Sequence, residues 1–271
     1  MPRTNKPASA VVTGTGRGLG AAIAEALCDA GIDVLGCGPQ AGEDAALVRP
    51  RTDGRGALYR IGCDITRPDT IQRTWEAAAE MFGTVDLWIN NAGLALTGAP
   101  LATLASEKFG QMVDINLVGT MNACRTAIAG MEKQGSGAIW NMLGAGWDGA
   151  PVAGMNGYAT TKAALTFMTH ALASEAQDQP YTVGGISPGL VMTEGFFREH
   201  RQVPEERRAA RDAVVNVIGD HPETIACWIA ESVSIPAEND QILVWLTPEK
   251  IAARQAESPP RDILSRYRHD I

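Results

Sequence analysis

Tyr158 and Lys162 are the side chains whose types and spacing most directly suggest chemistry. They stand four residues apart, so on a helix both project from the same face. A nearby ammonium favours the ionised form of a phenol, and we expect it to lower the pKa of Tyr158 toward the working pH. A tyrosine in that setting can give or take a proton as a general acid or base.

A glycine-rich turn runs from Thr13 to Gly20 and reads T-G-T-G-R-G-L-G. It follows an apolar run and opens a helical pattern. Glycines allow a tight turn and a close approach of a pyrophosphate, while the helix N-terminus supplies N–H groups and positive potential. The spacing departs from a strict G-x-G-x-x-G, because Leu19 stands at the last glycine position. The turn predicts a dinucleotide phosphate site.

The elements that must position these residues alternate between strand-like and helix-like patterns. We expect strands at 8–13, 32–37, 58–63, 85–90, 137–143, 182–186 and 241–246, and helices at 18–30, from 66 onward, and at 105–133 and 158–177. The alternation predicts an α/β fold: a Rossmann-type, doubly wound parallel sheet of about seven strands with helices on both faces.

The chain shows no internal repeat or low-complexity linker, so residues 1–271 are predicted to form a single dinucleotide-binding and catalytic domain. Residues 195–220 are irregular and highly charged, and we interpret them as a candidate substrate lid or a solvated helix. Residues 249–271 form a polar, helix-like C-terminal tail that either packs on a neighbouring subunit or is exposed.

Composition narrows the function class. The net charge of −8 and the pI of about 5.1 disfavour nucleic acid and anionic membranes as partners. The sequence has neither an apolar run of membrane-spanning length nor a secretory signal, so a cytoplasmic location is expected. The five cysteines are widely spaced and form no C-x-x-C pair, so we predict neither a disulfide framework nor a metal site.

Further motifs follow the glycine turn in a fixed order: Asn90-Asn91-Ala92-Gly93, then Asn116, then the Tyr158–Lys162 pair, then P-G-x-x-x-T at 188–193. Together they resemble the short-chain dehydrogenase/reductase family over about residues 8–193. The resemblance implies an NAD(P)-dependent oxidoreductase that transfers hydride between a nicotinamide cofactor and a carbonyl or secondary alcohol.

The resemblance also implies roles for individual residues. Tyr158 would exchange the substrate proton, Lys162 would hold the nicotinamide ribose, and Asn116 would support a water beside the lysine. The cofactor contacts it implies are Gly14, Thr15, Arg17, Gly18, Leu19, Gly20, Asp64, Ile65, Asn91, Ala92, Gly93, Tyr158, Lys162, Pro188, Gly189, Val191 and Thr193.

One departure from the family concerns a catalytic serine that usually follows the fifth strand. The corresponding position here is Gly144 or Ala145, and neither has a hydroxyl. Losing a comparable donor costs on the order of 10² to 10³ in rate. Asn156 could substitute, the substrate could carry its own polar group or be an imine, or the protein could be a nucleotide-binding regulator with a degraded site.

A second departure concerns cofactor choice. The end of the second strand, residues 36–40, carries neither the acid that usually holds the NAD ribose nor an arginine. Arg17, Arg49 or Arg51 could meet a 2′-phosphate instead. We therefore favour NADP(H) over NAD(H).

The predicted substrate is a small apolar or cyclic carbonyl or alcohol, because the residues expected at its site are mostly apolar. These residues are Gly144, Ala145, Trp147, Met155, Leu190, Phe196 and Phe197. The resemblance further implies a homodimer or homotetramer formed through the two long helices.

Overall fold

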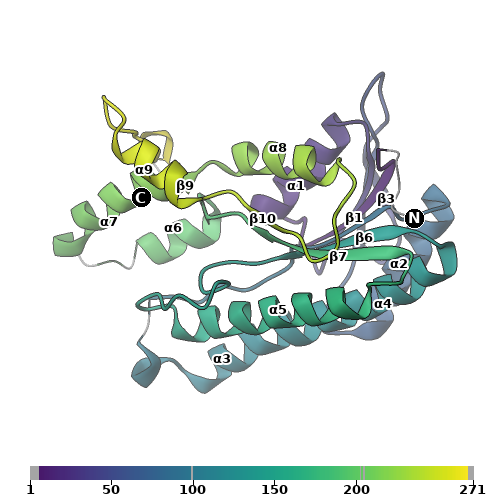
Figure 1. The fold of residues 1–271 in the computed structure, drawn as a ribbon, viewed down its shortest axis with the longest axis horizontal. Coiled ribbons are helices and arrows are strands. Elements are labelled where there is room, and N and C mark those ends of the chain that lie inside the picture. The colour runs from purple at the N-terminus through teal and green to yellow at the C-terminus, as the bar shows by residue number, and fades with distance from the viewer. Residues whose placement is uncertain (1–5, 99, 202, 204, 268–271) are drawn as a thin grey trace.

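The computed structural model describes residues 6–98, 100–201, 203 and 205–267. Its centre is an eight-stranded sheet in the order β10-β7-β6-β5-β1-β2-β4-β3, with helices on both faces (Figure 1). The strands of this sheet are β1 Ser9–Thr13, β2 Asp33–Gly38, β3 Ala46–Arg49, β4 Leu58–Gly62, β5 Leu87–Asn90, β6 Gly137–Met142, β7 Tyr181–Ser187 and β10 Ile242–Val244.

The strand pairings are parallel except for β3, which runs antiparallel to β4 at the sheet edge. The predicted parallel α/β sheet is confirmed, with β3 as an addition that the sequence did not predict. The side chains of Leu47 and Val48 in β3 are about half exposed, so this short edge strand lacks the buried apolar run that marks the others.

Two layers of helices cover the sheet. The helices are α1 Gly18–Asp29, α2 Pro68–Phe82, α3 Ser106–Val113, α4 Thr120–Gln134, α5 Asn156–Glu175, α6 Glu194–His200, α7 Glu205–Ile218, α8 Pro222–Val233 and α9 Pro248–Gln255. α1 and α8 lie on one face of the sheet, and α2, α4 and α5 lie on the other (Figure 1). Among the described residues, no helix is long and apolar enough to cross a membrane.

The long helix predicted over 105–133 is three consecutive segments in the structure. Between α3 and α4 the chain forms a π-helical turn, η2 Asp114–Gly119, with no break in direction. Single π turns inside α-helices are rare and frequently occur at functional sites. This one holds Asn116, whose side chain is completely buried.

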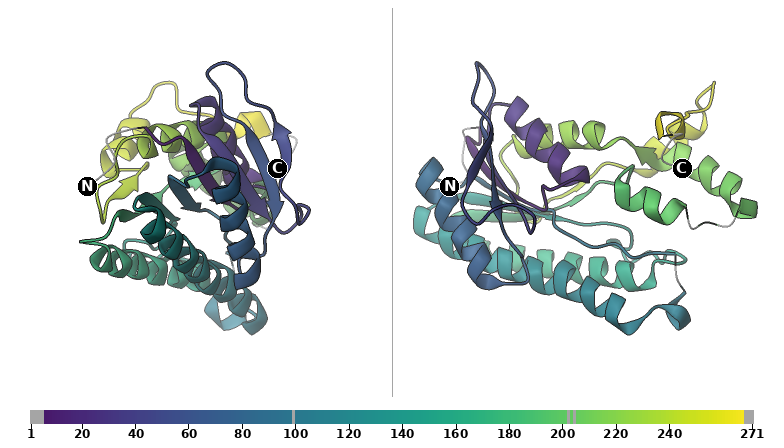
Figure 2. Two further views of the ribbon diagram at one scale, coloured as in Figure 1. Left: turned by 90° about the vertical axis from the view of Figure 1, so that its right-hand side faces the viewer. Right: turned by 180° about the vertical axis from the view of Figure 1, so that it is seen from behind.

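The region expected to be irregular, 195–220, is largely helical and forms a separate small core. α6 and α7 enclose the buried side chains of Met192, Phe196, Phe197 and Val215, together with Leu264 from a short 3₁₀ turn, η3 Leu264–Tyr267. The strands β8 Leu190–Val191 and β9 Gly219–Asp220 pair beside this core. Seen from behind, α6, α7 and α9 gather at one end of the molecule (Figure 2).

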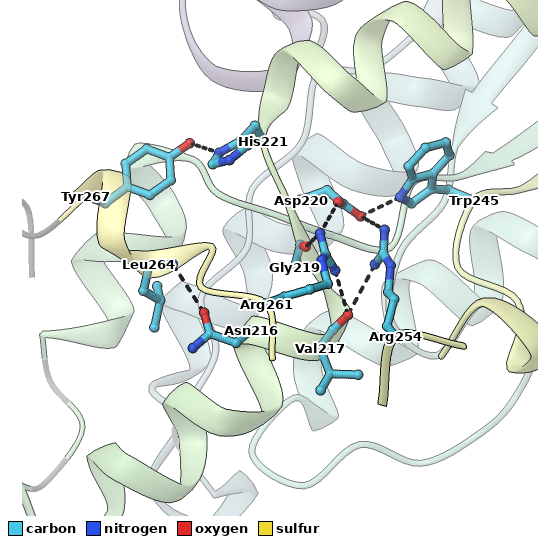
Figure 3. Close-up of polar contacts among 10 residues, drawn as sticks. All are labelled: Asn216, Val217, Gly219, Asp220, His221, Trp245, Arg254, Arg261, Leu264 and Tyr267. Carbon is cyan, nitrogen blue, oxygen red and sulfur yellow. Dashed lines mark hydrogen bonds and ion pairs between the residues drawn. The ribbon is translucent and has the colours of Figure 1, made fainter. Parts of the chain in front are cut away.

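The described part of the tail, residues 249–267, packs on its own chain, where we had expected either exposure or contact with another subunit. Asp220 accepts hydrogen bonds from Arg254 at 2.7 Å, from Arg261 at 2.8 Å and from the indole of Trp245 at 2.6 Å (Figure 3). Asp220 and Arg254 are both buried. This arrangement, which we call the Asp220 cluster, fixes the C-terminal segment against the end of α7. Residues 268–271 lie outside the described part of the chain.

Candidate active site

The glycine turn forms a closed cradle at the N-terminus of α1. A Cβ atom on Gly14, whose φ is +75°, would lie 2.7 Å from the Cα of Ala92. A Cβ on Gly20 would overlap the carbonyl oxygen of Gly14 and the amide nitrogen of Asn91. α1 has no side-chain cap and no acid in its first turn. Its terminal N–H groups therefore suit an anion such as a pyrophosphate.

Asn91 and Ala92 lock the cradle to the end of β5. Their backbone N–H groups donate to the hydroxyl of Thr13 at 3.0 and 2.9 Å, and the Asn91 amide donates to the Thr13 carbonyl at 2.9 Å. The motif thus joins the carboxyl ends of β1 and β5, where ligands bind in doubly wound folds.

A single cleft lies along this edge of the sheet. Of the predicted cofactor contacts, it is lined by Gly14, Arg17, Gly18, Leu19, Gly20, Asp64, Ile65, Asn91, Ala92, Gly93 and Thr193. Thr15 is placed differently, because its side chain is buried and packs over Gly36 of β2. The cleft also includes Gln40 and Arg198. The cradle and the open helix N-terminus fit the pyrophosphate of a dinucleotide.

The loop after β7 closes the other side of the cleft. Gly189 has a φ of +73° and turns the chain beside Trp245 and Leu246, while Pro188 is buried. Val191 packs against the main core from β8. Thr193 caps α6 by accepting a hydrogen bond from the N–H of Phe196 at 3.4 Å.

Asn116 and Lys162 meet at the inner end of the cleft. The Asn116 amide accepts from the N–H of Leu94 at 2.7 Å and donates to the Leu94 carbonyl at 2.9 Å and to Thr161 at 3.0 Å. A Cβ on Gly93 would lie 3.4 Å from Asn116 Oδ1 and 3.8 Å from Lys162 Nζ. The three predicted residues are therefore brought together by β5, η2 and α5.

The charge state of the tyrosine differs from the sequence prediction. Burial raises the pKa of Tyr158 above its usual value, and the nearby Glu199 carboxylate raises it further. Lys162 donates to the carbonyl of Met142 at 2.8 Å and lies 5.7 Å from the centre of the Tyr158 ring. Burial also lowers the pKa of Lys162 to about 8. The expected lowering of the tyrosine pKa is thus wrong for this structure, because burial disfavours the charged form of the phenol.

Comparison with known proteins identifies the family. The sequence profile of the short chain dehydrogenases matches residues 8–203. The chain belongs to the short-chain dehydrogenase family. It is therefore an NAD(P)-dependent oxidoreductase that acts on CH–OH or C=O groups.

Relatives within the short-chain dehydrogenase family differ in substrate. The short-chain reductase protein NovJ of Streptomyces niveus is 32% identical over 81% of this chain and 84% of its own length. L-fucose dehydrogenase of Oryctolagus cuniculus is 32% identical over 76% of this chain and 70% of its own length. The structure of L-sorbose reductase from Gluconobacter frateurii shares the fold, with a TM-score of 0.74 and 22% identity over 90% of this chain and 97% of that one.

Gly144, where the sequence predicts a missing catalytic serine, lies against the tyrosine. A Cβ there would overlap the hydroxyl oxygen of Tyr158 and lie 3.1 Å from its Cζ. The tyrosine hydroxyl therefore occupies the space that a side chain at 144 would need. Ala145 follows in the same loop, and Asn156 is exposed at the first turn of α5.

The structure separates the predicted substrate residues into two groups. Trp147 and Met155 lie with Gly144 and Ala145 in the β6–α5 loop that leads to Tyr158. Leu190, Phe196 and Phe197 instead pack in the small core of α6 and α7, where both phenylalanines are buried. Both phenylalanine rings thus help to hold α6 in place, and their contact with substrate stays a prediction.

Two of the three arginines considered for a 2′-phosphate are engaged elsewhere. Arg49 pairs with Glu25 at 2.6 Å and with Asp29 at 3.1 Å, and Arg51 pairs with Asp33. Arg17 lines the cleft and forms an exposed pair with Glu194 at 3.4 Å. Of these three, only Arg17 is placed to meet the cofactor.

The sequence reasoning missed a contact that closes the site. Glu199 of α6 accepts hydrogen bonds from the N–H of Thr97 at 3.1 Å and from the Thr97 hydroxyl. The next residue, Gly98, donates to the carbonyl of Gly154 at 2.7 Å. No local pattern indicates these pairs, because their partners are far apart in the sequence. Within the described residues, no cluster of His, Cys, Asp or Glu could hold a metal ion.

Proposed function

We propose that Tyr158 is the acid/base residue of a reversible carbonyl–alcohol oxidoreduction. The observation that carries this proposal is that Asn116 and Lys162 lie beside Gly93, which lines the cleft, and that the ammonium of Lys162 lies 5.7 Å from the centre of the Tyr158 ring. A nicotinamide bound there would supply or accept the hydride. Tyr158 Oη would give the substrate oxygen its proton in reduction and take it back in oxidation.

Lys162 and Asn116 position the tyrosine and the cofactor ribose. Lys162 is held by the Met142 carbonyl, so its ammonium stays near the tyrosine ring in a buried setting. Asn116 is fixed by three hydrogen bonds and keeps the end of η2 against α5. Fixed groups of this kind stabilise developing charge with little reorganisation.

The test is Tyr158→Phe, which removes the hydroxyl and keeps the ring. We expect kcat/KM to fall by about 10² to 10⁴-fold while the Kd for the nicotinamide cofactor is unchanged. The matched control is Tyr59→Phe, since Tyr59 lies on β4 and packs on Phe82 away from the cleft. Full activity in Tyr158→Phe would overturn the acid/base assignment.

NADP(H) is the cofactor that we propose, because Arg17 lines the cleft and the end of β2 presents Gln40 instead of an acid. Arg17→Met should reduce the affinity for NADPH more than for NADH, measured by fluorescence titration. Equal losses for the two cofactors would mean that Arg17 does not read the 2′-phosphate.

A C=N substrate is a second candidate, favoured by one observation. Gly144, at the usual serine position, supplies no hydroxyl that could donate a hydrogen bond beside Tyr158. Reduction of an imine depends less on a second hydrogen-bond donor than reduction of a ketone does. Comparing matched cyclic ketones and cyclic imines in the NADPH-dependent direction decides between the two. If cofactor binds but no substrate of either class turns over, the chain is better explained as a nucleotide-binding regulator.

We propose a small, largely apolar or cyclic substrate and a homo-oligomer formed through α4 and α5. The exposed side chains Met121 of α4 and Phe167 of α5 support this interface, with exposed fractions of 57% and 76%. Phe167→Glu should reduce the mass in solution, measured by light scattering after size exclusion. A cytoplasmic location stays a prediction.

A further inference from the structure

Glu199 lies where α6, the loop after β5 and the loop that leads to Tyr158 meet. α6 brings its carboxylate to Thr97 in the loop after β5, and the neighbouring Gly98 bonds to Gly154 in the loop that leads to Tyr158. Three residues before Thr97, Leu94 is bonded to Asn116. The carboxylate is therefore tied to both loops that border the tyrosine.

The orientation of the Glu199 side chain follows from the two faces of α6. Phe196, Phe197 and His200 are buried in the small core, while Arg198 lines the cofactor cleft. Glu199 projects between these two faces and is only partly buried. A side chain anchored on a helix with three buried neighbours loses little further freedom when it binds a ligand.

Both carboxylate oxygens contact Thr97, yet each can accept further hydrogen bonds. The charge also lies close enough to the Tyr158 hydroxyl to raise its pKa. Gly144, where a side chain would lie against that hydroxyl, carries no polar group. Glu199 therefore supplies a hydrogen-bond acceptor near the tyrosine that Gly144 does not supply.

We propose that Glu199 is a specificity-determining residue that accepts a hydrogen bond from a second polar group of the substrate, a hydroxyl or an ammonium beside the reacting carbon. This inference rests on the proposed oxidoreductase function. It selects vicinal diols, hydroxyketones or amino alcohols over simple alcohols, and it disfavours substrates with a carboxylate at that position by like-charge repulsion.

The test compares oxidation of four cyclic alcohols: cyclohexanol, trans-1,2-cyclohexanediol, trans-2-aminocyclohexanol and 2-hydroxycyclohexanecarboxylate. For the wild type we expect the diol or the amino alcohol to exceed cyclohexanol in kcat/KM by roughly ten- to a hundredfold, the range of a hydrogen bond to a charged group. In Glu199→Ala this ratio should fall to about one, because the acceptor is gone.

Further variants separate substrate recognition by Glu199 from a purely structural role of its contact with Thr97. Glu199→Gln keeps an acceptor oxygen, so it should retain a preference for the diol and lose one for the amino alcohol. Thr97→Val removes the hydroxyl that contacts Glu199. It tests whether loss of this contact lowers the activity on all substrates equally. Glu205→Gln, an exposed acid at the start of α7, is the matched control and should leave every ratio unchanged.

The outcomes are distinguishable. Turnover of cyclohexanol with equal kcat/KM for all four alcohols would overturn the role of Glu199 and leave the proposed function intact. If Glu199→Ala lowers kcat/KM equally for every substrate, Glu199 has only a structural role through Thr97, and substrate recognition by Glu199 is overturned. Absence of turnover with all four, and with the corresponding ketones, would count against the proposed function itself.

Discussion

The cofactor region and the C-terminal region of this protein are stabilised by different kinds of interaction. Around the glycine turn, backbone segments approach so closely that Gly14 and Gly20 leave no space for a side chain, and the hydrogen bonds are uncharged. Around α7 and α9, buried charges hold the chain, with Asp220 facing two arginines. The first arrangement tolerates little change in volume, and the second tolerates little change in charge.

The two regions also differ in whether the family profile covers them. The short-chain dehydrogenase profile ends at residue 203, before α7, β9, α9 and the Asp220 cluster. A dinucleotide is the common ligand of the family, so the region that binds it follows a common pattern. The region beyond 203 supports the helix that carries Glu199, because Val215 of α7 and Leu264 pack with Phe196 and Phe197 of α6.

Removing the central charge of the C-terminal region should have the largest effect on stability. Asp220→Ala leaves Arg254 and Arg261 without their buried partner, so we expect the free energy of unfolding to fall by about 3–5 kcal/mol. Urea unfolding followed by circular dichroism measures it. A loss below about 1 kcal/mol would show that these charges are effectively solvated and that the contrast between the regions is false.

Adding a methyl group to the cofactor cradle should have the next largest effect. Gly20→Ala places a Cβ against the backbone of Gly14 and the Asn91 amide, and overpacking of this kind typically costs about 1–3 kcal/mol. Both the unfolding free energy and the cofactor affinity should fall. Gly110→Ala on α3 is the control, because its Cβ would meet nothing within 4 Å. Similar effects of the two changes would disprove the steric account.

The buried ammonium of the cofactor region should make stability depend on pH. Burial lowers the pKa of Lys162 to about 8, so between about pH 8 and 10 the unfolded chain holds a proton that the folded chain has released. The unfolding free energy should therefore rise with pH across this window, by about 2 kcal/mol for this group. Above about pH 10 the raised pKa of Tyr158 acts in the opposite direction.

Lys162→Met should remove this rise, which is measured as the difference between wild type and variant in urea unfolding at pH 7.5 and 9.5. The substitution keeps a long apolar side chain in the buried position. If the two proteins show parallel pH dependence, the lysine is hydrated in the folded state and its pKa is not lowered.

An exposed pair in the C-terminal region should show the smallest effect. Arg266 and Glu223 lie 3.0 Å apart, with exposed fractions of 55% and 61%. Glu223→Gln should change the unfolding free energy by less than about 1 kcal/mol, because water screens the pair. Comparing it with Asp220→Ala in the same buffer tests whether burial, rather than the mere presence of ion pairs, distinguishes this region. A loss as large as that of Asp220→Ala would reject burial as the cause.

The sequence by itself determined the parallel α/β sheet, and it predicted the glycine turn as a phosphate site and Tyr158, Lys162 and Asn116 as a group. These features depend on local spacing: apolar periods of strand and helix, glycines at a turn, and two residues one helical turn apart. It also showed that a serine is absent, although it could not show what occupies its space.

Only the tertiary structure decided how the other side of the cleft is built. The Tyr158 hydroxyl lies against Gly144, Phe196 and Phe197 turn into a small core, and the tail folds back onto Asp220. Glu199 and Thr97 are 102 residues apart, so no period or motif in the chain connects them. Contacts of this kind depend on how helices and loops pack in three dimensions, and one sequence does not encode that packing in any local pattern.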